Sequence, residues 1–432
     1  MSELASLNTS TDHPQGGSMA WFVCITGGLF FFYEFFQLNL FDVVNQSLRE
    51  TFHLDSAQLS YMSSTYLLAN LIFLLPAGIL LDRFSVRKII LCTMSICIIG
   101  TIGFALTNSF AWASFFHFLS GIGNAFCFLS SIVLVSRWFP PNKQAFVIGC
   151  IVTLAFLGGM LAHTPLVLLN EHVGWRNSLQ IDGGVGIIIL VLLYFLVKDQ
   201  PTTNTTKNSK QHPPIFQSFM RALSNKQTFL PALYTSCLNL PIMVLGALWG
   251  ISYLQAEHHI SSLAASQVIS FVFIGSIVGC PLFGWLSDQQ GRRKPVMLVG
   301  ILGTLLAFLP LFLNIPLSIE ALCILFFTIG LFTSTQVVSY PLIAESNNPE
   351  ITGAATGIAS LIIMGGAAVA QVLFGWLLSH QDTNINISHT VPNFHFAMWL
   401  FPITTLLALA ALILTKETYC QHKNQGVFNG AD

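Results

Sequence analysis

Long apolar runs alternate with short polar segments along almost the whole of this 432-residue chain. Twelve runs approach or exceed the ~18 to 20 residues that an α-helix needs to cross a hydrocarbon core of ~30 Å. Six of them precede a long polar segment and six follow it, which predicts an all-α membrane protein with two pseudo-symmetric six-helix bundles. The predicted helices cover residues 19–43, 58–81, 89–107, 111–136, 145–169, 180–197, 229–254, 266–286, 295–313, 318–343, 354–379 and 393–415.

The polar segment in the middle of the chain, rich in Thr, Asn, Pro and Lys, is too polar to insert into a bilayer. We therefore expect it to be a linker between two bundles. The polar N-terminus lacks the basic region of a cleaved signal peptide, so we expect the first apolar run to be retained. The expected divisions are tail 1–18, N-terminal bundle 19–197, linker 198–228, C-terminal bundle 229–415 and tail 416–432.

Composition agrees with a polytopic membrane protein, since 53% of the residues are hydrophobic, 8% are charged and the mean hydropathy is +0.70. Of the 17 lysines and arginines, all but Arg49 and Arg176 fall on one side of the membrane, and none lies within a predicted span. The positive-inside rule makes that side cytoplasmic and places both termini there. Net charge near zero and the absence of a basic block argue against nucleic-acid binding.

Catalytic and metal-binding patterns are missing from the chain. The nine cysteines lack metal-ligand or CxxC spacing and are interpreted as small packing residues. No nucleotide-binding loop and no nucleophile-base arrangement is present. We therefore expect no enzyme activity, no ATP-driven pump, no cofactor and no metal.

Two short polar segments recur 206 residues apart, close to half the chain, which indicates an internal duplication. One follows the second predicted span and the other follows the eighth. Ser85 in the first copy stands where the second copy has Gly291. The shared positions are Gly78 and Gly284, Asp82 and Asp288, Arg87 and Arg293, and Lys88 and Lys294.

Twelve predicted spans and this doubled Gly-x-x-x-Asp segment with its basic residues resemble the major facilitator superfamily of secondary transporters. Further matches are His117-x-x-x-Gly121-x-Gly123 in the fourth span, although the family has arginine at the place of His117, and the segment from Glu345 to Gly357. The resemblance implies the major facilitator fold and alternating access, with substrate bound near the bilayer midplane between the halves.

The doubled segments predict a gate on the cytoplasmic side. Gly78 and Gly284 would allow helices to approach closely, and Asp82 and Asp288 would offer carboxylates to the start of the helix that follows each of them. Glu345 would brace the gate by pairing with a base. The other expected gate residues are Arg83, Arg87, Lys88, Gly291, Arg292 and Arg293.

A narrower resemblance rests on the span from Gly27 to Asp42 and on Ser63 to Asn70. These stretches look like the phagosomal nutrient (Pht-type) transporters of intracellular gamma-proteobacteria. That group implies uptake of amino acids or, in some members, nucleosides across a bacterial inner membrane. The fifth span has Gly158-Gly159 before Pro165 and lacks the order typical of proton-coupled drug exporters, which favours uptake.

Glu34 is the first candidate for chemistry because it lies well inside the first predicted span. An ionised carboxylate there costs ~2.5 kcal/mol or more unless it is paired, hydrated or protonated. Proton coupling or recognition of a substrate amine is one interpretation, and an interhelical hydrogen bond is the other. Gln37 and Phe41 share its face and Tyr33 lies beside it, so Tyr33 and Gln37 are expected substrate contacts.

His117 is the second candidate, since imidazole titrates near neutral pH and could pair with a carboxylate on the first helix. It shares one small, polar face of the fourth span with Asn124. A lone buried histidine is also often only a hydrogen-bonded core residue. His163 in the fifth span is a weaker candidate for a proton relay.

No carboxylate of the second half corresponds to Glu34. The pair Asn239 and Pro241 predicts a locally distorted, polar seventh helix. We expect neutral side chains of this half to form hydrogen bonds with the substrate. Each of these side chains could equally form only hydrogen bonds between helices. The candidates for substrate binding are Asn239, Gln336, Tyr340 and Gln371.

These features predict a secondary active importer of a small polar nutrient, first an amino acid and second a nucleoside, coupled to protons. Efflux on the same fold and a nutrient sensor are the alternatives. The expected partners are a small-molecule substrate, protons and the lipid bilayer, with a monomer as the functional unit.

Overall fold

The computed structural model describes residues 17–54, 56–162, 164–199, 215–312, 317–379 and 394–421. Within these ranges, twelve helical segments are long and apolar enough to cross a membrane, which confirms the predicted number. They are Ser18–Phe41, Tyr61–Arg83, Val86–Leu106, Phe110–Trp138, Pro141–Leu161, Trp175–Leu196, Lys226–Gly246, Ala264–Gln290, Lys294–Phe312, Ile319–Glu345, Pro349–Leu378 and Phe394–Leu414.

The first half differs from the predicted boundaries at its fifth and sixth spans. The expected run 145–169 is divided, because one helix ends at Leu161 and the next begins beside Pro165, at a position where proline is tolerated. The sixth span begins at Trp175, directly after Gly174 with its positive φ, and not at residue 180. The helices are α1 (Ser18–Phe52), α2 (Ser56–Arg83), α3 (Val86–Leu106), α4 (Phe110–Trp138), α5 (Pro141–Leu161), α6 (Thr164–Val173) and α7 (Trp175–Leu196).

In the second half, the seventh and tenth spans are interrupted by irregular turns. These spans run through α9, η1 and α10, and through α13, η2 and α14. The elements are α8 (Ile215–Ser224), α9 (Lys226–Leu240), the π-helix η1 (Pro241–Trp249), α10 (Gly250–His258), α11 (Ser262–Gln290), α12 (Lys294–Phe312), α13 (Ile319–Thr333), the 3₁₀-helices η2 (Ser334–Val338) and η3 (Pro349–Ile351), α14 (Ser339–Glu345), α15 (Thr352–Ser379), α16 (Phe394–Met398) and α17 (Leu400–Leu414).

The predicted distortion of the seventh helix is confirmed. Pro241 has no backbone N–H to donate, and the chain adopts a π-helix from Pro241 to Trp249. Gln371 Nε2 donates a 2.8 Å hydrogen bond to the backbone oxygen of Met243 inside this segment. π-Helical turns occur mostly as single irregular turns, frequently at functional sites.

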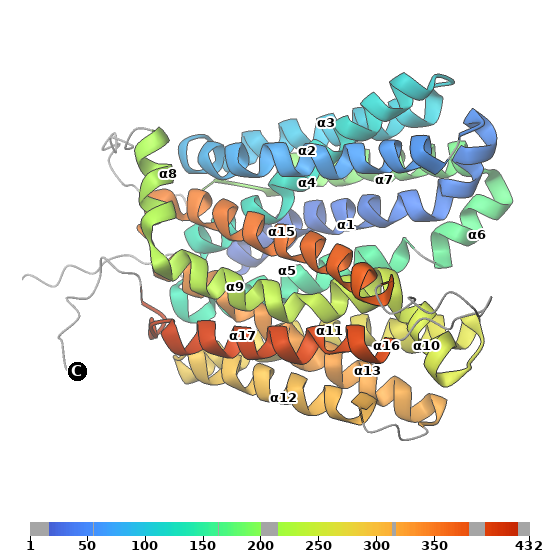
Figure 1. Ribbon diagram of the computed structural model, residues 1–432. Coiled ribbons are helices and arrows are strands. Elements are labelled where there is room, and N and C mark those ends of the chain that lie inside the picture. The colour runs from blue at the N-terminus through green and yellow to red at the C-terminus, as the bar shows by residue number, and fades with distance from the viewer. Residues whose placement is uncertain are drawn as a thin grey trace, which may run out of the picture.

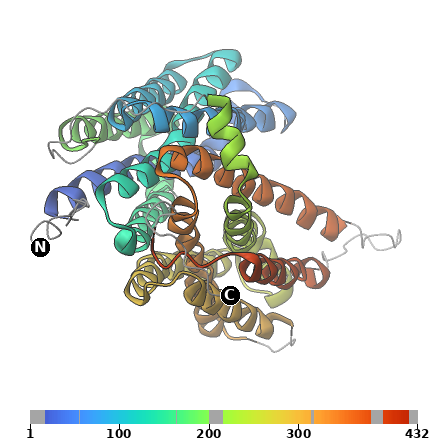
Figure 2. The same cartoon turned by 90° about the vertical axis from the view of Figure 1, so that its left-hand side faces the viewer.

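The two halves meet along two helix pairs, α2 with α15 and α5 with α11. Figure 1 shows α15 between α2 and α9, with α8 at one end of the molecule and α6 and α10 at the other. We call the end marked by α8 the loop end, and Figure 2 looks onto it, with the blue to green helices above the olive to red ones. Glycines allow the close approach, since a Cβ at Gly78 would overlap the backbone oxygen of Gly353.

We expect Gly78→Ala to destabilise the packed state by ~1 to 3 kcal/mol, because the added methyl group meets a backbone atom that only a helix shift can move. The melting temperature of the purified protein in detergent should fall. Gly365→Ala is the matched control, because nothing lies within 4 Å of its Cβ position. Equal melting temperatures for the two variants would show that the α2–α15 contact is not tight.

Candidate functional site

A buried carboxylate lies inside the N-terminal half, on α1. Glu34 has 0% of its surface exposed, and the Tyr66 hydroxyl donates a 2.9 Å hydrogen bond to its Oε2. Its Oε1 has no hydrogen-bond partner among the described residues, and it fills the space that any side chain at Gly123 would need. No Lys, Arg or His within the described ranges forms an ion pair with Glu34.

A second buried carboxylate, Asp182 on α7, lies close by with 5% of its surface exposed. Gln37 Nε2 donates to Asp182 Oδ2, and the Tyr33 hydroxyl donates to the Asp182 backbone oxygen at 3.4 Å. Tyr33 and Gln37, both expected to contact substrate, are therefore engaged within the N-terminal half. The predicted span 180–197 would place Asp182 near its beginning, but the helix starts five residues earlier, at Trp175, and Asp182 lies two turns inside it.

His117 makes aromatic contacts and no ion pair with the carboxylate of the first helix. Its ring stacks on Phe41 with a centroid distance of 4.9 Å and on Phe104 at 5.4 Å. The Tyr66 ring lies 5.4 Å away, and the Tyr66 hydroxyl bonds to Glu34. The expected His117–carboxylate pair is thus wrong, and Tyr66 lies between the two groups. His163 lies outside the described residues.

Aromatic side chains bridge the two halves. The ring centroid of Phe128 in α4 lies 4.6 Å from that of Tyr340 in α14 and 4.9 Å from that of Phe31 in α1. The ring centroids of Phe156 in α5 and Phe273 in α11 are 6.3 Å apart. These residues define an aromatic interface, of which the sequence singled out only Tyr340, because phenylalanine is abundant in every span.

The remaining polar candidates lie at or near this aromatic interface or the irregular turns. Asn124 is half-buried, one turn before Phe128, and its Oδ1 accepts from the Cys127 thiol at 3.7 Å. Asn239 and Gln336 are buried. Gln336 lies in η2, where its backbone oxygen accepts a 3.3 Å hydrogen bond from Thr235.

At the loop end, two aspartates join the halves crosswise. Asp82 accepts hydrogen bonds from the backbone N–H groups of Gly353 (2.7 Å) and Ala354 (2.9 Å) at the start of α15. Asp288 accepts in the same way from Phe146 (2.8 Å) at the start of α5. The prediction that each aspartate caps the helix after it is wrong, since each accepts from backbone N–H groups near the N-terminus of a helix in the opposite half.

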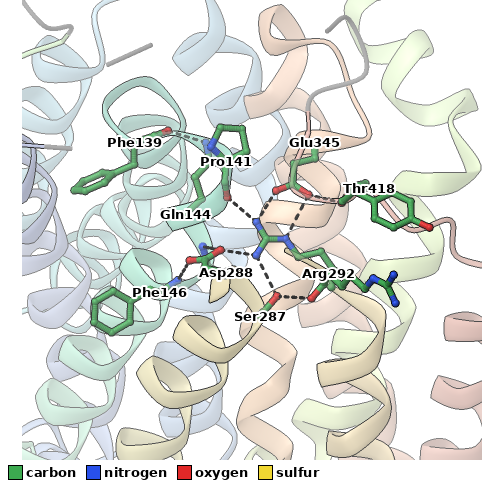
Figure 3. A network of polar contacts seen from close by, with 12 residues as sticks. Phe139, Pro141, Gln144, Phe146, Ser287, Asp288, Arg292, Glu345 and Thr418 are labelled. Carbon is green, nitrogen blue, oxygen red and sulfur yellow. Dashed lines mark hydrogen bonds and ion pairs between the residues drawn. The ribbon is translucent and has the colours of Figure 1, made fainter. Parts of the chain in front are cut away.

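Arg293 joins Asp288, Glu345 and the Pro141 backbone in one polar network. Figure 3 shows these three partners directed toward one another. Arg293 has 0% of its surface exposed. Its Nη1 donates to Asp288 at 2.6 Å, and its Nη2 donates to Glu345 Oε1 and to the Pro141 backbone oxygen, each at 2.6 Å. Burial opposes the charge, but the carboxylates of Glu345 and Asp288 outweigh it and hold the pKa of Arg293 above its usual value.

Within the described part of the chain, the side chains of the other predicted gate bases form no ion pair with Asp288 or Glu345, although the Arg292 backbone oxygen accepts a 3.2 Å hydrogen bond from Ser287. Arg87 Nη2 donates a 2.5 Å hydrogen bond to the Tyr194 backbone oxygen. Lys88 and Arg292 are exposed and Arg83 is half-buried. Gly291 ends α11 with a φ of +62°, a conformation that favours glycine.

The chain after α17 also contacts this network, which sequence reasoning missed. The Glu417 carboxylate accepts 2.9 Å hydrogen bonds from the backbone N–H groups of Arg293 and Lys294 at the start of α12. The Thr418 hydroxyl donates to Glu345. Cys420 is buried, and burial, together with the nearby carboxylates, raises its pKa to about 12.

Twelve spans in two halves that meet at an aromatic interface are the features of a multi-pass membrane protein. The chain matches the model of the Major Facilitator Superfamily over residues 26–250 and 232–428, and it belongs to this family. The predicted major facilitator fold is thus confirmed.

Several relatives align with most of the chain. It is 24% identical to the membrane sensor protein UhpC of Escherichia coli K12, over 69% of this chain and 68% of that protein. It is 24% identical to a probable hexose phosphate transport protein of Chlamydia muridarum (82% and 84%) and 26% identical to the cis,cis-muconate transport protein of Acinetobacter baylyi (77% and 81%). The proton:xylose symporter XylE, solved with 6-bromo-6-deoxy-D-glucose, shares the fold with a TM-score of 0.71 at 15% identity, over 94% of this chain and 98% of that structure.

We expect Arg293→Ala to separate the halves at the loop end. It leaves Asp288 and Glu345 buried without their cation, which costs ~3 to 5 kcal/mol. Alkylation of Cys420 by N-ethylmaleimide, followed by peptide mass spectrometry, reports the change. In the packed state the raised pKa keeps this thiol protonated and unreactive near neutral pH. Loss of the Arg293 charge alone would raise the Cys420 pKa further, because that guanidinium lowers it, so faster alkylation reports opening. Opening returns the pKa toward its ordinary value, and each unit multiplies the thiolate fraction by about ten, so the rate should rise about tenfold or more.

Arg292→Ala is the control, because Arg292 is adjacent in sequence but exposed. Its Cys420 should react as slowly as that of the unmodified protein. Equal rates for Arg292→Ala and Arg293→Ala would contradict the role of Arg293 in holding this end closed.

Proposed function

We propose that the protein is a proton-coupled secondary active importer of a small polar nutrient, with amino acids as the first substrate class. The observation that carries the proposal is the full burial of the Glu34 carboxylate, hydrogen-bonded to Tyr66 and without an ion pair among the described residues. An ionised carboxylate without a cation is costly in such surroundings, so this group favours its protonated form. A proton that binds and leaves Glu34 during the cycle would couple transport to a proton gradient.

Alternating access follows from the two ends of the molecule. The crosswise aspartates and the Arg293 network fasten the loop end. We assign this end to the cytoplasm, because the positive-inside rule places its basic residues there, with both termini on that side of a bacterial inner membrane. The packed state then corresponds to a transporter closed toward the cytoplasm, and import requires these contacts to break.

The substrate is proposed to bind at the aromatic interface between the halves. Asn124, Tyr340, Asn239, Gln336 and Gln371 would supply neutral hydrogen bonds there, while Glu34 serves the proton. His117 is a proposed aid to coupling through Tyr66, whose ring lies beside it. We retain a monomer as the functional unit, with residues 198–228 as a cytoplasmic linker.

Charge argues for a substrate without net charge. Hexose phosphate and cis,cis-muconate, named for two relatives, are anions, and recognition of an anion generally needs a cation. No Lys or Arg lies within a predicted span of this chain. A zwitterionic amino acid suits such a site, as the resemblance to phagosomal nutrient transporters implies, and a nucleoside is the second choice. The name of UhpC keeps a nutrient sensor as an alternative.

We expect Glu34→Gln to abolish gradient-driven accumulation while leaving some substrate exchange, because a neutral amide mimics the protonated acid. Uptake of a labelled panel of amino acids and nucleosides into proteoliposomes, with and without an acid-outside gradient, measures both. Glu320→Gln is the control, since Glu320 is exposed at the start of α13, and it should transport normally. Unchanged accumulation by Glu34→Gln would remove this residue from the coupling role.

The same assay separates the alternatives. Release of a panel member when the gradient is reversed would indicate efflux. Saturable binding of a panel member without any transport would indicate a sensor.

A further inference from the structure

The proposed function gives Glu34 a role but gives none to Asp182. Asp182 is the other carboxylate buried inside the N-terminal half among the described residues. It lies two turns into α7, and both of its described polar contacts come from α1. Gln37 binds its side chain, and Tyr33 binds its backbone oxygen. Since Glu34 lies between these two residues in α1, one short stretch of α1 carries one buried carboxylate and binds the other.

Neutral or acidic groups face Asp182 from the neighbouring helices. From α1 they are Tyr33, Glu34 and Gln37, and from α3 the nearby titratable group is the Cys97 thiol. On α6, the described titratable side chain is His172, which is exposed. On α7 itself, Arg176 is directed elsewhere, because its Nη1 donates 2.7 and 2.8 Å hydrogen bonds to the backbone oxygens of Ala105 and Thr107.

The energetic consequence is that these two carboxylates cannot both be ionised at low cost. Removing one ionised carboxylate from water costs several kcal/mol when no cation compensates it. Two such charges in one bundle also repel each other. Amide, hydroxyl and thiol groups supply hydrogen bonds but no opposite charge.

We propose that Asp182 is a second proton-binding site, separate from Glu34 and hydrogen-bonded to α1 through Gln37. The packed state then holds two protons in the N-terminal half. Gln37 links them mechanically, because it lies one turn beyond Glu34 on α1, so a movement of α1 changes the surroundings of both carboxylates together. The inference deepens the proposed function, and its role in coupling rests on that function, whereas proton binding itself does not.

Infrared difference spectroscopy of the purified protein, titrated with pH in the absence of any substrate, tests the proposal. A protonated carboxyl group has its own C=O stretching band, which shifts in deuterated water. We expect Asp182→Asn to remove one part of this band and Glu34→Gln to remove another, with both parts lost in the double variant. Glu320→Gln, which changes an exposed carboxylate, should leave the band unchanged.

A second variant covers the case in which Asp182→Asn does not fold. Gln37→Leu removes the hydrogen bond to Asp182 while keeping the carboxylate, so it should shift the Asp182 part of the band and leave the Glu34 part in place. A band that is the same in the unmodified protein, in Asp182→Asn and in Gln37→Leu would overturn the proposal.

These outcomes are independent of transport. If no panel compound is transported but the two parts of the band are found, the proposed function fails and the second proton site stands. If accumulation depends on Glu34 but Asp182 contributes no band, the proposed function stands and the second site fails.

Discussion

The hydrogen bonds from helix N-termini to aspartates of the opposite half are the constraint on which the packed state depends. The first turn of a helix has N–H groups without intrahelical partners. At the start of α15, Asp82 satisfies such groups from the opposite half, while Asp288 accepts from backbone N–H groups in the second turn of α5. Because each carboxylate and its N–H partners belong to different halves, the loop end cannot open without breaking both sets of hydrogen bonds.

The two copies of this contact are reinforced unequally. Beside Asp288, the buried Arg293 also binds Glu345, and the segment after α17 adds contacts from Glu417 and Thr418. Beside Asp82, the Arg137 guanidinium donates to the Leu81 backbone oxygen and forms no comparable pair of carboxylate bonds among the described residues. The duplicated halves thus have an aspartate at the same position. The contact made by Asp288 has additional ion pairs around it, and the contact made by Asp82 has none comparable among the described residues.

Neighbouring positions of α1, three residues apart, serve the aromatic interface and a buried carboxylate. Phe31 contacts Phe128, which in turn contacts Tyr340 of the other half, whereas Glu34 and Gln37 bind groups within their own half. A rigid helix therefore connects the site proposed for the proton with the site proposed for the substrate. Coupling can follow from movement of this helix and needs no direct contact between proton and substrate.

The sequence by itself determined the twelve spans, the duplication, the distortion after Asn239 and the depth of Glu34, because hydrophobic length, repeats and proline act locally along the chain. Only the tertiary structure decided which groups meet. Tyr66 hydrogen-bonds to Glu34, and the His117 ring stacks on Phe41. Asp82 and Asp288 each bind backbone N–H groups of the opposite half. Asp182 shows the reason most directly. A shift of five residues in the start of α7 separates a solvated helix end from a buried carboxylate, and the packing of α1 against α7 provides its partner.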